Sequence, residues 1–451
     1  MLVAISIAAA AGNCGAWYAI PRLCMSLKVG YAAAAAVGAL PLLVIVSWGR
    51  MLPALLGLYI VLVPIDDALL VYGGLTVTKI VGLAIALAAA VELIRKRPRI
   101  AVPYAVLGWV ALVALMAMSL SWSINPEESI GNVVTIASAL ALLVIVVVTP
   151  MEASDLRIVV LATILSGAAI GVVAIAQRHD ISEIAGQVGR IYLSFGTATL
   201  DPNRFGASLL LPIAMATGAF FQVRGWWVRA GLLCVLGMAF TAVYLSASRG
   251  TLVALGVMAV IAILGSKRRV LLGSLLAAAA ALVLIIPSEL SQRIQEGTAQ
   301  SGTGRTDIWK VGIAAIPSHW LLGTGQGTFH TAYNRAFFLT HQSVFLEWGR
   351  DPHNLIVSTI VELGVVGVLF LAVALILQYR SVRLIPADDP FAWLRPVLRA
   401  SLIGLIVAAM FVDVLATKFA WVLLMEMLLF AAFAARSSLP GRAPVPSIVA
   451  R

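Results

Sequence analysis

The feature that most constrains this sequence is a series of uninterrupted apolar runs that recur along the whole chain. A helix needs about 20 apolar residues to cross roughly 30 Å of hydrocarbon, and most of the runs have this length. The 451 residues are 61% hydrophobic and only 11% charged, whereas soluble chains average about 25% charged residues. A water-soluble fold is therefore excluded, and the sequence predicts an all-α, polytopic transmembrane protein.

Apolar runs bounded by charges, proline or glycine clusters give roughly 12 to 14 predicted spans. They cover residues 31–48, 52–70, 78–94, 101–120, 129–149, 157–176, 205–222, 229–248, 251–266, 270–287, 354–378, 399–414 and 419–435. Residues 2–20 are interrupted by Gly12 and Asn13 and follow no basic segment, which favours a weak first span over a cleaved signal peptide. The expected organisation is a transmembrane bundle (1–287), a large exported loop (288–353), further spans (354–436) and a cytoplasmic tail (437–451).

Positive charges indicate the orientation of these spans. The 31 Lys and Arg exceed the 20 Asp and Glu, a formal charge of +11, and such an excess is expected in the cytoplasmic loops of a membrane protein rather than at a nucleic-acid site. Counting through the spans places the basic clusters on one side, although Arg22 and Lys28 fit this less well. The clusters are Arg95 to Arg99, Arg224 and Arg229, Lys267 to Arg269, Arg380 to Arg399, and Arg436 to Arg451.

The opposite, exported side receives the two longest polar segments, residues 177–204 and 288–353. All five histidines fall in them, and because histidine titrates near neutrality, chemistry is expected on this face; they are His179, His319, His330, His341 and His353. The second segment also has amphipathic stretches, with Ile308 and Val311 at helical spacing and an aromatic set that includes Tyr333. These helices are expected to lie on the membrane surface, with their rings at headgroup depth.

The strongest local signal is Asp351-Pro352-His353-Asn354, which opens an apolar run. Aspartate at an N-cap and proline at the first helical position form a typical helix start, and they predict His353 in the first turn. A helix N-terminus disfavours an added positive charge, so His353 is expected to stay neutral, as a general base must. A histidine that only caps or packs at the interface is an equally good interpretation of this pattern alone.

Three arginines on the exported side are candidate anion ligands. Arg249 lies at a tight turn between two spans, where it either extends its side chain to the interface or binds a lipid-borne phosphate. Arg305 precedes a surface helix that is expected to be capped by Thr306 or Asp307, and Arg204 marks the start of another span. For each arginine, an ordinary structural role is the alternative.

Other motifs are less specific. Residues 323–327 (Gly-Thr-Gly-Gln-Gly) lack the Lys-Ser/Thr of a nucleotide loop and are expected to form turns. Neither CxxC nor HExxH is present, so no metal is predicted. Glu362, Asp413 and Glu426 fall within predicted spans, where interhelical hydrogen bonds are the commoner explanation and a proton or ion pathway is the alternative.

Four stretches together resemble the O-antigen ligase and polymerase superfamily, in both order and spacing. They are Ser-Ala-Ser-Arg249-Gly, Arg305-Thr-Asp-Ile-Trp309, Gly-Thr-Gly-Gln-Gly-Thr-Phe329, and Pro-His353-Asn followed by Glu362-Leu-Gly. The recognisable stretch runs from about 200 to 380, and the residues from Pro64 to Asp67 and from Gly73 to Lys79 are similar to the family's first exported loop.

This resemblance implies a metal-independent, cofactor-free glycosyltransferase of the C-type helical fold in the bacterial inner membrane, with its active site facing the periplasm. The donor would be an undecaprenyl-diphosphate-linked glycan. The acceptor would be the lipid A-core oligosaccharide in the preferred ligase branch, or another lipid-linked repeat unit in the polymerase branch. The family's functional residues correspond to His353 as general base and to Arg249 and Arg305; Arg204 and Lys79 are placed as further diphosphate ligands by position.

Two interpretations from other classes stay open at this point. A transporter or flippase for a lipid-linked substrate would use Glu362, Asp413 and Glu426 as a coupling-ion route, although the halves show no paired broken segments. A structural scaffold would offer no reason for confining the histidines to one face.

Overall fold

The computed structural model describes residues 50–72, 75–98, 102–176, 194–195, 198–199, 201–264, 305–337, 340 and 350–437. The predicted spans at 2–20, 31–48 and 270–287 lie outside these residues, as do His179, His341 and nearly all of the predicted tail.

Helices make up almost all of the described structure, which confirms the predicted polytopic all-α class. They are α3 (Met51–Leu62), α4 (Val77–Lys96), α5 (Tyr104–Met118), α6 (Pro126–Val148), α7 (Ala153–Ala176), α8 (Pro202–Ser208), α9 (Leu210–Gln222), α10 (Trp226–Ser246), α11 (Arg249–Leu264), α14 (Arg305–Ala314), α15 (Phe329–Phe337), α16 (Leu355–Ser381), α17 (Leu394–Ala408) and α18 (Lys418–Ser437). Short 3-10 helices are η2 (Val63–Ala68), η3 (Ser119–Ser121) and η4 (Val382–Leu384). Two small antiparallel hairpins pair β1 (Leu70–Tyr72) with β2 (Leu75–Thr76) and β3 (Ser194–Phe195) with β4 (Ala198–Thr199).

Eight helical segments in the described part of the chain are long and apolar enough to cross a membrane, and two shorter apolar ones begin at Met51 and Arg249. The total of 12 to 14 spans stays a prediction. Apolar side chains such as Leu83, Leu87 and Leu369 are 60 to 63% exposed on the outer helices, as expected of surfaces that face lipid.

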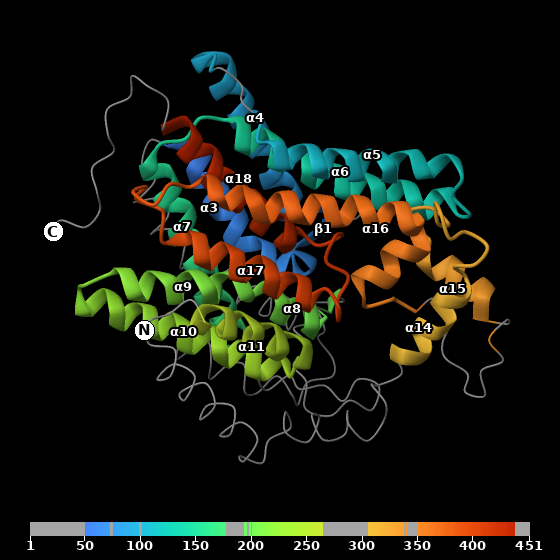
Figure 1. Cartoon of the computed structure of the whole chain (residues 1–451). Helices are drawn as coiled ribbons and strands as arrows, with labels where there is room; N and C mark the ends of the chain where they lie inside the picture. Colours follow the sequence, from blue (N-terminus) through green and yellow to red (C-terminus); the bar gives the residue numbers. More distant parts are fainter. Residues whose placement is uncertain are drawn as a thin grey trace, which may run out of the picture.

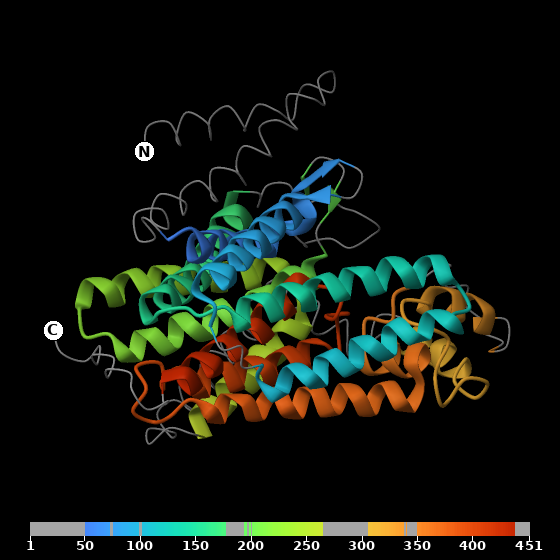
Figure 2. The same cartoon turned by 90° about the horizontal axis from the view of Figure 1, so that it is seen from above.

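The helices pack as a layered bundle, with α16 running along one edge of it (Figures 1 and 2). Helix α7 packs against α3 and α10, α16 against α5, and α11 against α17. Helix α18 is the most enclosed candidate span, with 83% of its apolar window buried. The small helices α14 and α15 lie together at one end of the bundle, opposite the end that holds the α9–α10 turn.

Three predicted spans differ clearly from the structure. The span predicted at 52–70 is an α-helix only as far as Leu62 and continues as η2 and β1. The span predicted at 399–414 is α17, which begins at Leu394 and ends at Ala408, so Asp413 lies in the following turn rather than inside a helix. The span predicted at 354–378 is not one regular helix, because Gly364 has φ +66° and breaks it. A Cβ at Gly364 would lie 2.3 Å from the backbone of Leu321, so the break lets another segment approach closely.

Candidate functional site

The starts of α8 and α11 lie side by side, and each carries one of the predicted arginines. Asp201 caps α8, because its side chain accepts a hydrogen bond from the backbone N–H of Asn203 at 2.7 Å. The Asn203 Oδ1 accepts a hydrogen bond from Ser248 Oγ at 3.1 Å. Arg204 follows Asn203 and Arg249 follows Ser248, so this buried bond joins the two arginine-bearing helix starts.

The start of α14 joins the same region through Phe411, a residue of the turn between α17 and α18. The guanidinium carbon of Arg305 lies 5.8 Å from the centroid of the Phe411 ring. The same side chain packs against Gly250, where an added Cβ would lie 2.7 Å from the Phe411 Cβ. Arg305 was expected in a flexible loop before a capped helix; instead it is the first residue of α14, and Thr306 and Asp307 lie within that helix.

The segment from Asp351 to Asn354 completes this cluster of helix starts. The predicted cap at Asp351 is wrong, since α16 begins at Leu355 and the Asn354 side chain accepts hydrogen bonds from the N–H groups of Ile356 and Val357. His353 therefore precedes the helix, in a left-handed conformation with φ +45°. For a residue other than glycine this conformation costs roughly 1–3 kcal/mol and persists only where surrounding contacts impose it.

The two residues before His353 are tied to neighbouring helices. The carbonyl oxygen of Pro352 accepts a hydrogen bond from Trp309 Nε1 at 2.9 Å. The carboxylate of Asp351 accepts a hydrogen bond from His330 Nε2 at 2.7 Å. The segment is thus attached to α14 by Trp309 and to α15 by His330, and sequence reasoning had assigned neither contact.

Burial, together with two neighbouring arginines, favours the neutral form of His353. Burial lowers the pKa of His353 below its usual value, the positive charges of Arg305 and Arg204 lower it further, and Asp201 and Asp351 oppose the shift. The sequence predicted a neutral imidazole, but the cause it named was the helix dipole. Because Arg204 and Arg305 both act on the same ring, the structure brings these residues into one electrostatic environment.

The neighbouring pair has the opposite behaviour. The hydrogen bond to Asp351 raises the pKa of His330, and the same bond lowers the pKa of Asp351. The two histidines therefore favour different protonation states: His330 favours the charged form and His353 the neutral form. Burial raises the pKa of Asp413, and the positive charge of Arg204 opposes that rise.

Glu362 has a structural role beside the site. Its Oε2 accepts hydrogen bonds from Gln326 Nε2 and the Gly327 N–H, each at 2.9 Å, and its Oε1 accepts one from the Phe329 N–H at 3.2 Å. The glycine-rich stretch forms the expected turns, and its amides donate to the protein's own Glu362 carboxyl group. Its turns need glycine, since Gly323 has φ +69° and a Cβ there would lie 2.2 Å from the Glu362 backbone.

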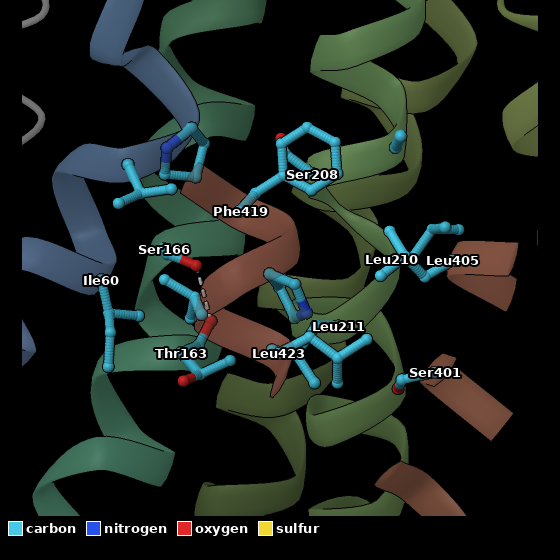
Figure 3. A pocket seen from close by; sticks show the side chains of 15 residues that line it. Ile60, Thr163, Ser166, Ser208, Leu210, Leu211, Ser401, Leu405, Phe419 and Leu423 are labelled. Carbon is cyan, nitrogen blue, oxygen red and sulfur yellow. Dashed lines mark hydrogen bonds between the residues drawn. The ribbon is translucent and has the colours of Figure 1, made fainter. Parts of the chain in front are cut away.

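Glu426 lies deeper in the bundle, on α18, and Thr163 Oγ1 donates a hydrogen bond to its Oε1 at 2.6 Å. Thr163 also lines a small cavity with Ser166, Ser208 and Ser401 (Figure 3). The cavity has a volume of about 30 Å³, which accommodates water but not a lipid diphosphate. The interhelical hydrogen bond expected for Glu426 is therefore present.

The aromatic helices do not have the predicted surface arrangement. Tyr333 and Phe329 are only 0% and 2% exposed, and they pack with Ile308, Val311 and Val361. The inner faces of α14 and α15 thus pack against each other and α16 instead of placing these rings among lipid headgroups. Figure 1 shows the two helices stacked beside the start of α16.

Lys79 is exposed in the first turn of α4, and none of the contacts above joins it to the three arginines. A lysine that the sequence analysis did not single out, Lys418, organises this region: its Nζ donates hydrogen bonds to Asp66 Oδ2 and Thr78 Oγ1, each at 2.6 Å, and to Thr76 Oγ1 at 3.0 Å. The start of α18 thereby anchors the segment that follows α3, which contacts α8 through η2.

Within the described residues, no group of three or more histidine, cysteine or acidic side chains is arranged to hold a metal ion. The prediction that catalysis needs no metal stays a prediction.

Comparison with protein families finds one match, to the family described as O-Antigen ligase, over residues 233–372. The matched stretch includes Arg249, Arg305, His353 and Glu362, whereas Arg204 and Phe411 lie outside it. A search of curated proteins finds no match.

Proposed function

Because the domain at residues 233–372 identifies the chain as a member of the O-antigen ligase superfamily, we propose that it is an inverting glycosyltransferase of the periplasmic face of the bacterial inner membrane. The family match supports ligase-type or polymerase-type chemistry in general. Our more specific proposal is the ligase reaction, in which O-antigen polysaccharide moves from undecaprenyl diphosphate to a sugar hydroxyl of the lipid A-core oligosaccharide.

The observation that carries this proposal is the convergence of helix starts that bear Arg204, Arg249 and Arg305 on the segment of His353. A helix N-terminus carries a partial positive charge, and its N–H groups suit anions. Guanidinium groups bind phosphate oxygens through two parallel hydrogen bonds. The arrangement therefore supports binding of a diphosphate group, with an uncharged base beside it.

In the proposed reaction, the acceptor hydroxyl oxygen forms a bond to the anomeric carbon while the bond from that carbon to the diphosphate oxygen breaks. His353 accepts the hydroxyl proton as general base. Negative charge develops on the leaving diphosphate, where Arg305 and Arg249 stabilise it. Removal of one such preorganised donor typically slows a reaction by about 10²–10³-fold.

The contacts of Glu362 favour this function over transport. A coupling-ion route needs carboxylates that are able to exchange ligands, whereas Glu362 accepts three hydrogen bonds from the protein.

Glycan analysis of a strain that lacks this chain tests the proposal. A missing ligase should leave long polymers on the carrier lipid and none on the core, and the native chain, but not a His353→Ala chain, should restore transfer. Single repeat units on the core would instead indicate a polymerase, and unchanged glycans would contradict both. Transfer by the purified chain should also resist EDTA; strong inhibition reversed by Mg²⁺ would contradict the arginine-based mechanism.

A further inference from the structure

Phe411 contacts two of the arginine-bearing helix starts at once. Its ring lies 5.8 Å from the Arg305 guanidinium carbon, within the range of a cation–π interaction. A Cβ added at Gly250 would lie only 2.7 to 2.9 Å from the Cβ, Cγ and Cδ2 atoms of Phe411. The absence of a side chain at Gly250, beside Arg249, is therefore what allows the ring to occupy this position.

The turn that carries Phe411 is attached to the remaining parts of the site. The carbonyl oxygen of Ala409 accepts a hydrogen bond from the Leu355 N–H at 2.8 Å, which places the turn beside the start of α16. Asp413, in the same turn, interacts with the charge of Arg204. A short segment outside the matched family domain thus contacts α11, α14 and α16 and lies close to Arg204.

We propose that Phe411 is a positioning residue, whose ring fixes the guanidinium of Arg305 relative to the start of α11 so that Arg305 and Arg249 face one diphosphate. A cation–π contact uses the charge of the guanidinium and needs none of its N–H groups as hydrogen-bond donors to the ring. The ring therefore orients Arg305 without competing with phosphate for its hydrogen bonds. This inference rests on the proposed function.

The first experiment compares Phe411→Leu with Phe411→Tyr, which keeps the ring, and uses Phe240→Leu on the outer surface of α10 as the matched control. Binding of farnesyl diphosphate to the purified full-length chain is measured together with the KM for the lipid-linked donor. Loss of the cation–π contact should weaken binding about tenfold in Phe411→Leu, while Phe411→Tyr and the control stay near the native value and all variants keep the native unfolding temperature.

Native binding and KM in Phe411→Leu, or equal losses in Phe411→Leu and Phe411→Tyr, would overturn the positioning role. Failure of the proposed function has a different signature, because the native chain itself would then transfer no glycan and bind no diphosphate.

A second experiment tests the geometry without any substrate. Thermal unfolding is compared for Gly250→Ala, Phe411→Gly and the double variant, because only glycine removes the Phe411 Cβ that would lie 2.7 Å from the added methyl group. Gly231→Ala is the control, since nothing lies within 4 Å of a Cβ there. The added methyl group should destabilise the native chain and cost clearly less once the ring is absent, a coupling that a double-mutant cycle detects. Additive effects would contradict the contact between Phe411 and Gly250 on which the proposal depends.

Discussion

The indole nitrogen of Trp309 donates a hydrogen bond to the carbonyl oxygen of Pro352 at 2.9 Å. This bond joins the helix that begins with Arg305 to the residue that precedes His353. The segments that carry the proposed anion ligand and the proposed base are therefore directly connected, although they are far apart in the sequence.

Replacing Trp309 with phenylalanine should loosen this connection. An ordinary hydrogen bond contributes about 0.5–1.5 kcal/mol, so glycan transfer should slow by roughly 2- to 12-fold while the fold is retained. The measurement is the initial transfer rate, with Trp320→Phe as control because Trp320 is 57% exposed. Equal rates in Trp309→Phe and the native chain would show that the bond does not position His353.

The pH profile should report the neutral histidine. Because burial and Arg305 lower the pKa of His353, kcat/KM should fall only as the pH drops through a value below the ordinary histidine value of about 6.5. In Arg305→Gln the positive charge that opposes protonation of His353 is gone, so the pKa of His353 should rise. The remaining kcat/KM should therefore begin to fall at a higher pH than in the native chain. If the apparent pKa on the acid side of the kcat/KM profile were unchanged or lower in this variant, the electrostatic interaction between Arg305 and His353 would be contradicted.

Glu362→Gln should separate a structural carboxylate from an ion pathway. Glu362 accepts three hydrogen bonds through its two oxygens, whereas glutamine has only one side-chain oxygen. The amide NH2 of the glutamine would face an N–H donor of the protein, so the free energy of unfolding should fall by about 1–3 kcal/mol. Transfer per folded molecule should persist at low temperature. The control is Glu127→Gln, at an exposed position on α6. Native stability combined with lost activity would favour the ion route instead.

The His330–Asp351 pair should make stability depend on pH in a defined window. His330 has a raised pKa, so its contribution is fully present below the unfolded value of about 6.5 and is lost as the pH rises through the folded value. Asp351 has a lowered pKa, so its contribution is lost as the pH falls below the unfolded value of about 3.9. The unfolding temperatures of the native chain and of His330→Gln should therefore differ most at pH values between the unfolded pKa of Asp351 and the folded pKa of His330. The two temperatures should become equal at alkaline pH. A difference that grows with pH would contradict the pair.

The sequence predicted those parts of the fold and site that have local signals. The length of the apolar runs predicted the helices. Arg249, Arg305 and His353 could be selected because each lies where a polar segment meets an apolar run or a helix start. The cap was assigned wrongly because Asp351 and Asn354 are both good N-cap residues, and only the packed structure selects the second. The left-handed conformation of His353 has no signal in the sequence.

The contacts that the sequence could not predict are all long-range. Phe411 looks in the sequence like an ordinary apolar residue near the end of a span. Its contacts with Arg305 and Gly250 arise only because the turn after α17 lies beside the starts of α11 and α14. Lys418 likewise finds its partner Asp66 across 352 residues. The aromatic rings of α15 were placed among lipids because their pattern is amphipathic, but α14 and α16 provide the buried surface they pack against.

The most direct test of the central claim is the initial rate of glycan transfer from undecaprenyl diphosphate by purified, folded His353→Ala and Arg305→Ala. Arg335→Ala serves as a matched control, since Arg335 is an exposed arginine on the same side. The site described above predicts a loss of about 10²–10³-fold for Arg305→Ala and at least about 10²-fold for His353→Ala, with the control close to the native rate. Full transfer by either site variant would contradict it.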